Sequence, residues 1–232
     1  MNKIGIIGAM DEEVTKIKEQ MEQVQVKTKA SMDFYRGKIK GKEVVVVRSG
    51  IGKVNACICA QILVDDYRVD GIINTGIAGS LRSEINIGDI VISTDAVQHD
   101  MDAVAFGYPL GQIPRMDTLA FQADEKLAEL AEKSCHKVTP ELGVFRGRVA
   151  SGDAFIAKKE RKQMIEDEFH AYCCEMEGAA IAQAAHLNRI PFVIIGAISD
   201  KADDSAHMDY PAFEAMAIEN SVHIILEMVV NQ

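Results

Sequence analysis

Residues 191–198 read Pro-Phe-Val-Ile-Ile-Gly-Ala-Ile, and Ser199 and Asp200 follow them directly. An apolar run of this length, rich in branched side chains, is typical of a strand that is buried on both faces of a sheet. Residues 3–10 and 71–75 have a similar character. Because such strands need helices on both sides of the sheet, these runs predict an α/β fold.

The chain alternates strand-like runs with longer segments of helical periodicity. We expect strands at residues 3–10, 33–40, 43–48, 71–75, 89–96, 143–150 and 191–198. We expect helices at residues 12–21, 53–67, 124–136, 175–187 and 209–230, the last of them capped by Asp209. A hairpin around Gly41 makes the sheet mixed. The prediction is a three-layer α/β/α fold with a mixed central β-sheet, and since no linker interrupts the sequence, it forms one domain over residues 1–232.

The composition argues against several classes of protein. The 232 residues carry a formal net charge of −10 with scattered basic residues, so no nucleic-acid partner is expected. No apolar run approaches the roughly 18 residues that span a bilayer. The acidic residues 11–13 do not suit a signal peptide, so we expect a cytoplasmic protein with no membrane partner. Five cysteines without a Cys-x-x-Cys and six histidines without ligand spacing predict neither a disulfide framework nor a metal site.

The ends of the strands are the place to look for a ligand, because sheets of this kind bind ligands beyond the carboxyl ends of their strands. The segments concerned are 10–13, 49–53, 75–79, 151–156 and 199–200. The first strand ends without G-x-G-x-x-G, and the chain has no G-x-x-x-x-G-K-[ST] loop. Nicotinamide and nucleoside-triphosphate functions therefore lose their main support.

Several side chains at these strand ends have both a structural and a functional interpretation. Glu13 lies in an acidic triplet that a helix dipole would favour. Phe155 is either a core side chain or a ring that stacks on a base. Glu175 and Glu177 open an otherwise apolar helix, where an unpaired carboxylate is costly and a ribose diol would supply two donors. Asp200 is either a helix cap or a working acid, and singly none of these residues decides the matter.

Seven segments occur in one order along the chain: Ile6-Ile7-Gly8-Ala9-Met10-x-Glu12-Glu13, Ser49-Gly50-Ile51-Gly52-Lys53-Val54, Asn74-Thr75-Gly76, Ala105-Phe106-Gly107-Tyr108, Ser151-Gly152-Asp153-Ala154-Phe155-Ile156, Glu175-Met176-Glu177 and Ala197-Ile198-Ser199-Asp200. Jointly they resemble the 5′-methylthioadenosine/S-adenosylhomocysteine nucleosidase family, over nearly the whole chain. The resemblance implies the purine nucleoside phosphorylase-like fold. It also implies hydrolysis of the N-glycosidic bond of a 5′-thio-substituted adenosine, without a metal or an organic cofactor.

The resemblance further implies a division of labour among three carboxylates. Asp200 would protonate adenine N7, with Ser199 helping to position it, and Glu13 would activate the attacking water. Glu177 would hold the ribose 2′- and 3′-hydroxyls, with Met176 against the sugar. This division agrees with the two-carboxylate chemistry of inverting glycosidases, in which the acid needs a raised pKa.

The remaining site residues are implied by the same resemblance. Phe155 would stack on adenine, and the backbone of Ile156 would read the edge of the base. The other substrate-binding positions are Ile51 and Tyr210 at the sugar and its 5′-thio substituent, together with Met10, Ala78, Gly79, Glu175 and Phe213. The protein would be a homodimer in which Phe106 and Pro114 reach into the site of the neighbouring subunit.

The sequence departs from the family pattern at Gly196, where the family usually carries an arginine. That arginine is expected to pair with the carboxylates of the site and to help hold the water. Its absence predicts raised carboxylate pKa values and slower turnover with an intact fold. Ile77, where some relatives have serine, is a smaller departure with little expected effect.

Two other functions stay open at this point. A purine nucleoside phosphorylase on the same fold would need cationic side chains for phosphate, and neither Glu13 nor the missing arginine favours it. A binding protein for adenosine derivatives could have lost catalysis through Gly196. The sequence also leaves the 5′ substituent open between methylthioadenosine, S-adenosylhomocysteine and 5′-deoxyadenosine.

Overall fold

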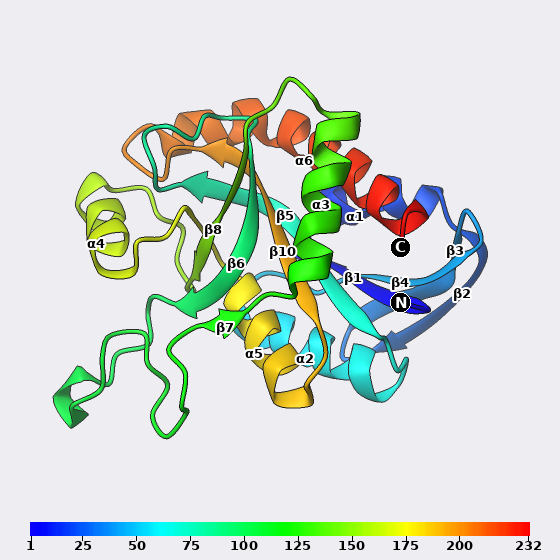
Figure 1. Ribbon diagram of the computed structural model, residues 1–232, viewed down its shortest axis with the longest axis horizontal. Helices are drawn as coiled ribbons and strands as arrows, with labels where there is room; N and C mark the ends of the chain where they lie inside the picture. The colour runs from blue at the N-terminus through cyan, green and yellow to red at the C-terminus, as the bar shows by residue number, and fades with distance from the viewer.

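A twisted sheet of ten strands runs through the centre of the computed structural model, which describes residues 1–232 (Figure 1). Parallel and antiparallel pairs both occur, as the hairpin led us to expect. In spatial order the strands are β10 (Phe192–Asp200), β6 (Ile90–Gln98), β8 (Val144–Ser151), β9 (Cys173–Glu175), β5 (Gly71–Ser80), β1 (Lys3–Gly8), β4 (Lys42–Arg48), β3 (Met32–Ile39) and β2 (Glu22–Lys29), with β7 (Phe121–Gln122) paired to β6. Strand β10 pairs with β5 as well as with β6, so that β5, β9, β8, β6 and β10 close into a ring.

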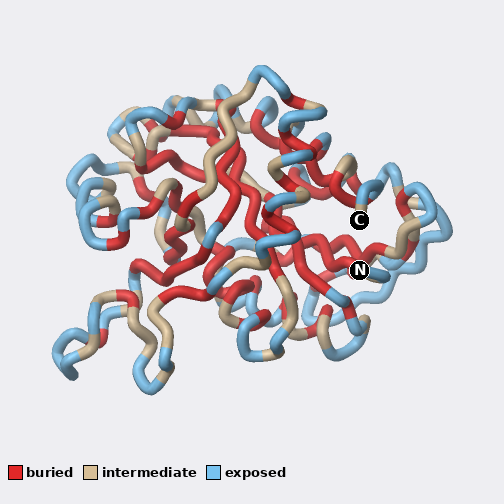
Figure 2. Tube along the Cα trace, viewed as in Figure 1, coloured by how far each residue is buried: buried red, intermediate tan, exposed pale blue.

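Helices cover both faces of the sheet, which confirms the predicted three-layer fold. Helices α2 (Lys53–Asp65) and α5 (Gly178–Asn188) pack together on one face, and their apolar side chains form one buried cluster with that face. Helices α1 (Asp11–Glu19), α3 (Glu125–Val138) and α6 (Ala206–Val230) cover the other face and form a second cluster with it. The buried backbone accordingly follows the sheet through the middle of the molecule (Figure 2). No helix is both long and apolar enough to cross a membrane.

The pairing of β10 with β5 sets the geometry at the carboxyl end of the sheet. The two strands run parallel, with Ile194 opposite Asn74 and Gly196 opposite Gly76. The register shifts between Ile198 and Asp200, so that Asp200 pairs with Gly79. Every residue of β10 is buried. Asp200 is therefore the last residue of a buried strand, and not a residue of a surface loop.

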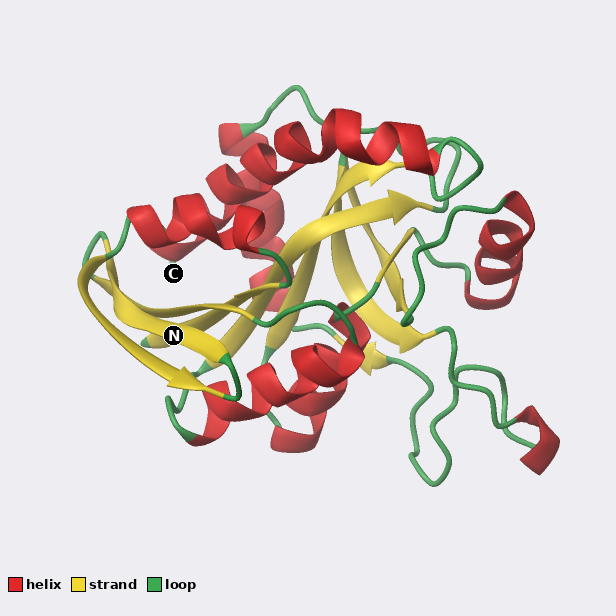
Figure 3. Ribbon diagram, turned by 180° about the vertical axis from the view of Figure 1, so that it is seen from behind, coloured by secondary structure: helices red, strands yellow, loops and turns green.

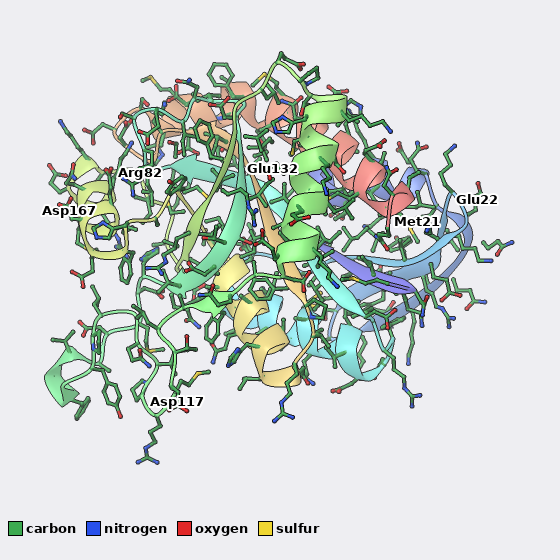
Figure 4. All side chains as sticks on the ribbon, in the orientation of Figure 1. Met21, Glu22, Arg82, Asp117, Glu132 and Asp167 are labelled. Carbon is green, nitrogen blue, oxygen red and sulfur yellow. The ribbon has the colours of Figure 1, made fainter.

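Five elements were not predicted, among them the two-residue β7 and the 3₁₀ turn at Val104–Phe106, because they are short or their sequences lack a burial pattern. All eight residues of the edge strand β2 are exposed, and Glu22 points to solvent (Figure 4). Helix α4 (Lys159–Phe169) buries only Ile165 and Phe169. Strand β9 has three residues. Short or solvated elements of this kind carry little hydrophobic periodicity.

Two predicted helix starts were wrong. Helix α5 begins at Gly178 and not at residue 175, because Glu175 ends β9 and Glu177 occupies the N-cap position. Helix α6 begins at Ala206, so Asp209 lies in its first turn and does not cap it. Asp209 instead accepts a hydrogen bond from Ser205 Oγ at 2.5 Å.

The segment between β6 and β7 forms an arm that projects from the body of the molecule (Figures 1 and 3). It carries a short 3₁₀ helix, η1 (Val104–Phe106), at its outer part. The side chain of Asp117, on the return of the arm, also points to solvent (Figure 4).

Candidate active site

A cavity of about 410 Å³ opens at the carboxyl end of the sheet, which is within the usual size range of small-molecule sites. Its walls come from the ends of β1, β5, β9 and β10 and from the first turns of α1 and α6. The lining residues are Ala9, Met10, Glu13, Ile51, Ile77, Ala78, Gly79, Phe155, Cys174, Glu175, Met176, Glu177, Ser199, Asp200, His207, Tyr210 and Pro211. The predicted strand ends therefore meet at one site.

Asp200 lies at this cavity with its side chain almost fully shielded from solvent. Its Oδ1 accepts a hydrogen bond from the backbone N–H of Ala202 at 2.7 Å, and its Oδ2 accepts one from Ser199 Oγ at 2.9 Å. Burial raises the pKa of Asp200, and these two hydrogen bonds only partly oppose the shift. A carboxyl group with a raised pKa at a ligand cavity is suited to donate a proton.

Glu13 lies in the first turn of α1, but its carboxylate turns back toward the sheet. Its Oε2 accepts hydrogen bonds from the backbone N–H groups of Ala9 (2.6 Å) and Met10 (2.9 Å). Its Oε1 accepts one from the N–H of Ile77 at 3.2 Å. Burial raises the pKa of Glu13 to about 7, in spite of these three donors. Glu13 thus fits both earlier interpretations, since it bonds to the start of the helix and also faces the cavity.

Glycine at position 76 makes room for this carboxylate. A Cβ atom there would lie 2.8 Å from Glu13 Oε1, which is closer than real Cβ contacts come. The glycine of the Asn74-Thr75-Gly76 segment is therefore explained by the approach of Glu13 and not by a special backbone angle.

Glu175 and Glu177 flank Met176 in the sequence, but their carboxylates have different hydrogen-bond partners. Glu177 Oε1 accepts a hydrogen bond from the backbone N–H of Gly52 at 2.6 Å. Burial raises the pKa of Glu177 to about 8, and the nearby charge of Glu175 adds to the shift. Glu175 accepts hydrogen bonds from Ser151 Oγ and from the backbone N–H groups of Glu177 (2.9 Å) and Gly178 (2.6 Å). Glu175 therefore caps α5, whereas Glu177 keeps an oxygen without a partner in the chain.

The aromatic rings of Phe155, His207 and Tyr210 form another side of the cavity. The rings of Phe155 and Tyr210 are perpendicular with centroids 5.8 Å apart, and the His207 ring lies 5.6 Å from Phe155. The hydroxyl of Tyr210 donates to Glu214 Oε1 at 3.1 Å and lies 3.6 Å from Met10 Sδ. Phe155 is 45% exposed at the cavity, so its ring is accessible to a base that stacks on it.

Comparison with known proteins now identifies the family. The sequence model of the phosphorylase superfamily matches residues 3–230. A 5′-methylthioadenosine/S-adenosylhomocysteine nucleosidase of Bacillus thuringiensis is 41% identical over 228 residues, which cover 98% of each chain. The chain belongs to this nucleosidase family.

Solved structures of relatives have the same fold. The nucleosidase of Neisseria meningitidis in complex with methylthio-immucillin-A aligns over 100% of both chains, with 36% identity and a TM-score of 0.96. The native futalosine hydrolase of Helicobacter pylori aligns over 100% of this chain and 98% of that chain, with 34% identity and a TM-score of 0.94. The predicted purine nucleoside phosphorylase-like fold is therefore confirmed.

The acidic side chains of the site have no lysine or arginine beside them in the lining of the cavity. Gly196 on β10 lines a small neighbouring cavity of about 10 Å³, together with Glu13, Glu175 and Glu177. Neither this cavity nor the larger one is lined by lysine or arginine. A Cβ atom at position 196 would lie 3.2 Å from Ala78 Cβ and 3.5 Å from Cys173 Sγ, so even the first atom of a side chain requires Ala78 to move by a few tenths of an ångström.

Some predicted site residues lie elsewhere. Ile156 lines a separate extension of about 30 Å³, which it shares with Phe155 and Asp200. Phe213 is 37% exposed on α6 and does not line the cavity. Phe106 and Pro114 are exposed on the arm, outside the cavity of their own chain.

His207 lines the cavity although no motif in the sequence indicated it. The structure places His207 in the first turn of α6, three residues before Tyr210, and both face the cavity. An earlier start of the helix would have put the two side chains on neighbouring positions of one helix face. Ala9, Ile77, Cys174 and Pro211 also line the cavity without having been assigned to it.

Proposed function

We propose that this protein hydrolyses the N-glycosidic bond of 5′-methylthioadenosine and S-adenosylhomocysteine and releases adenine. The observation that carries the proposal is the pair of buried carboxyl groups, Asp200 and Glu13, at one cavity with a stacking ring, Phe155. Membership of a family of nucleosidases supports it. The proposed substrates also include 5′-deoxyadenosine, which has the same base and ribose diol.

The proposed reaction uses one carboxyl group as acid and one carboxylate as base. Asp200 donates its proton to adenine N7 while the C1′–N9 bond breaks and its electron pair leaves with the base. The oxygen of water then bonds to C1′, and Glu13 accepts the proton that this water loses. Positive charge that develops on the sugar is stabilised by the carboxylates of Glu13 and Glu177.

Glu177, Met176 and Phe155 hold the substrate in this proposal. The ribose 2′- and 3′-hydroxyls donate to Glu177, whose second oxygen has no partner in the chain. Adenine stacks on Phe155, and the 5′ substituent lies toward Ile51 and Tyr210, with Met10 beside Tyr210. Glu175 helps to fix the backbone at Glu177, because its Oε2 accepts a hydrogen bond from the N–H of that residue.

The activity should depend on pH in a direction set by Glu13. Its pKa is raised to about 7, and only the ionised carboxylate accepts a proton from water. We therefore expect kcat/KM to rise with pH on the acid side of its profile, because Glu13 loses its proton there. Since Glu13 interacts with Glu177, the midpoint belongs to the group of carboxylates and not to one residue. Asp200 must keep its proton and therefore sets the fall on the alkaline side, so a profile without an acid limb is the result that would contradict the assignment of Glu13 as base.

The direct test is adenine release from methylthioadenosine in phosphate-free buffer, followed by chromatography of the products. Hydrolysis predicts free adenine and a 5-thio-substituted ribose, with no gain in rate when phosphate is added. A phosphorylase would need phosphate, but no lysine or arginine lines the cavity to bind it. A binding protein would take up methylthioadenosine in calorimetry and release nothing.

The 5′ substituent is a second question for the same assay. A futalosine hydrolase is among the structures that share this fold at 34% identity, so the fold also accommodates substrates other than the thioethers. Relative kcat/KM values for methylthioadenosine, S-adenosylhomocysteine, 5′-deoxyadenosine and futalosine decide which substituent this cavity accepts best.

We further propose that two copies of the chain form a homodimer in which the arm completes the partner's site. Phe106 is 83% exposed at the outer part of the arm, which is unusual for a phenylalanine that serves only its own subunit. Helix α2 also leaves apolar side chains uncovered, with Val54 71% and Ile58 40% exposed. These side chains are suited to an interface between subunits.

Replacing Phe106 with alanine tests this role of the arm. Loss of an apolar contact to the substrate should raise KM for methylthioadenosine by about 10-fold, which corresponds to about 1.4 kcal/mol. Val24→Ala, on the exposed edge strand, is the matched control and should leave KM unchanged. Analytical ultracentrifugation shows whether the wild type is a dimer. An unchanged KM for Phe106→Ala would remove Phe106 from the site.

A further inference from the structure

The loop before α2 holds the proposed ribose carboxylate through a single backbone group. Gly52, the N-cap residue of α2, donates its N–H to Glu177 Oε1 at 2.6 Å. It does so with φ +96°, a conformation that favours glycine. The conformation of this loop sets the direction of the Gly52 N–H, and the N–H in turn sets the position of Oε1 of Glu177.

The next residue connects this loop to the one that carries Phe155. The backbone N–H of Lys53 donates to Asp153 Oδ1 at 2.8 Å. Asp153 belongs to the segment that follows β8 and stands two residues before Phe155. The ribose side and the base side of the cavity are therefore joined by a hydrogen bond that lies outside the cavity itself.

Asp100 completes the connection from the end of β6. Its Oδ1 accepts from Lys53 Nζ at 2.5 Å, and its Oδ2 accepts from the backbone N–H of Asp153 at 2.9 Å. Burial favours a higher pKa for Asp100, but the bonds from Lys53 and Asp153 outweigh it and lower the pKa. Lys53 Nζ also donates to Gln98 Oε1 at 3.1 Å. The side chains of Lys53 and Asp100 are only 17% and 22% exposed.

We propose that Lys53, Asp100 and Asp153 form an ionic clamp that fixes Glu177 relative to Phe155. The proposal rests on the proposed function, because it takes Glu177 as the ribose ligand and Phe155 as the base ligand. None of the three clamp residues lines the cavity, so they are positioning residues and not catalytic ones. Opening the clamp frees the loop at Gly52 and removes the donor that favours the ionised form of Glu177.

The clamp acts on geometry more than on folding stability. Asp153 is exposed, and hydrogen bonds and ion pairs of exposed groups contribute little to stability. Removing the side chain of Asp153 is therefore expected to alter substrate binding without a matching loss of Tm. A change in KM without a change in Tm would therefore indicate a positioning role, whereas a loss of both would indicate general destabilisation.

Asp153→Ala is the test variant, and Asp153→Asn is the conservative one, because its amide oxygen still accepts from the N–H of Lys53. We expect Asp153→Ala to raise KM for methylthioadenosine by about 10-fold, as for a lost ligand contact. The acid limb of the kcat/KM profile should move to higher pH, and Asp153→Asn should restore most of both properties. Lys53→Met, which keeps the stem and removes the charge, should resemble Asp153→Ala.

The control is Asp95→Ala, which breaks the partly buried pair of Asp95 with Arg148 between β6 and β8. It should lower Tm and leave KM and the pH profile unchanged. Equal changes in KM for Asp95→Ala and Asp153→Ala, or wild-type KM and pH limb in Asp153→Ala, would overturn the clamp.

A titration by ¹³C NMR of the glutamate carboxyl groups, assigned with Glu177→Gln, tests the clamp without any activity. The midpoint of Glu177 should rise in Asp153→Ala and stay in place in Asp95→Ala. If the wild type releases no adenine but this shift occurs, the proposed function fails and the clamp stands. If the wild type is active and Glu177 does not shift, the clamp fails and the proposed function stands.

Discussion

Asp200→Asn should reduce kcat for adenine release by about 100- to 10,000-fold, the range associated with loss of a general acid. The amide has nearly the same shape, and it still accepts a hydrogen bond from the N–H of Ala202. It cannot supply a proton to N7, so adenine would leave as an anion. Chromatographic assay of adenine release measures kcat, and calorimetry with methylthioadenosine shows whether the variant still binds.

Asp203→Asn is the matched control for this substitution. Asp203 lies three residues after Asp200, in the loop that follows β10, and accepts hydrogen bonds from Ser205, but it does not line the cavity. It should keep kcat within a few-fold of the wild type. If Asp200→Asn keeps most of the activity, or if Asp203→Asn loses as much, Asp200 is not the acid and the mechanism proposed above fails.

The sequence was sufficient for the fold because the central strands are apolar over their whole length. Residues of β1, β5 and β10 are almost all buried, so their runs are readable without knowledge of their partners. The closed ring of strands was not predictable. It depends on the pairing of β10 with both β5 and β6, and on the three-residue strand β9 that joins β5 to β8. Pairing between strands far apart in the chain leaves no local pattern.

Much of the candidate site followed from the rule that ligands bind beyond the carboxyl ends of strands. Glu13 and Asp200 lie in two of the predicted strand-end segments, and they line one cavity with Glu177, which was predicted at the start of a helix. The side of the cavity formed by α6 was less predictable, because Pro211 lies inside that helix and misplaced its expected start. Phe213 shows where this side of the cavity ends: at about 100° per residue it lies about 60° from Tyr210 and about 120° from His207 around the helix axis, so it does not line the cavity.

Gly196→Arg should increase kcat/KM most strongly at acidic pH, by about 10-fold or more at pH 6. A guanidinium at position 196 would have to widen the small cavity, but it would then lie beside Glu13 and Glu177, and an opposite charge at that range lowers the pKa of a carboxyl group by about 1–3. Burial raises the pKa of Glu13 to about 7 and that of Glu177 to about 8, so both are substantially protonated at pH 6. The substitution should move the acid limb of the kcat/KM profile to lower pH, and the gain should shrink above pH 8.

Gly196→Met separates charge from packing, since it fills the same space without a cation. It should leave the acid limb in place, and a gain equal to that of arginine would attribute the effect to volume. No gain for arginine at any pH would mean that the site does not need the cation. The structure offers a physical reason for that outcome: Glu13 accepts three backbone N–H bonds, and Glu177 accepts one from Gly52. Gly196→Arg and Gly196→Met together therefore measure whether backbone N–H donors alone keep Glu13 and Glu177 ionised, or whether a buried positive charge is also needed.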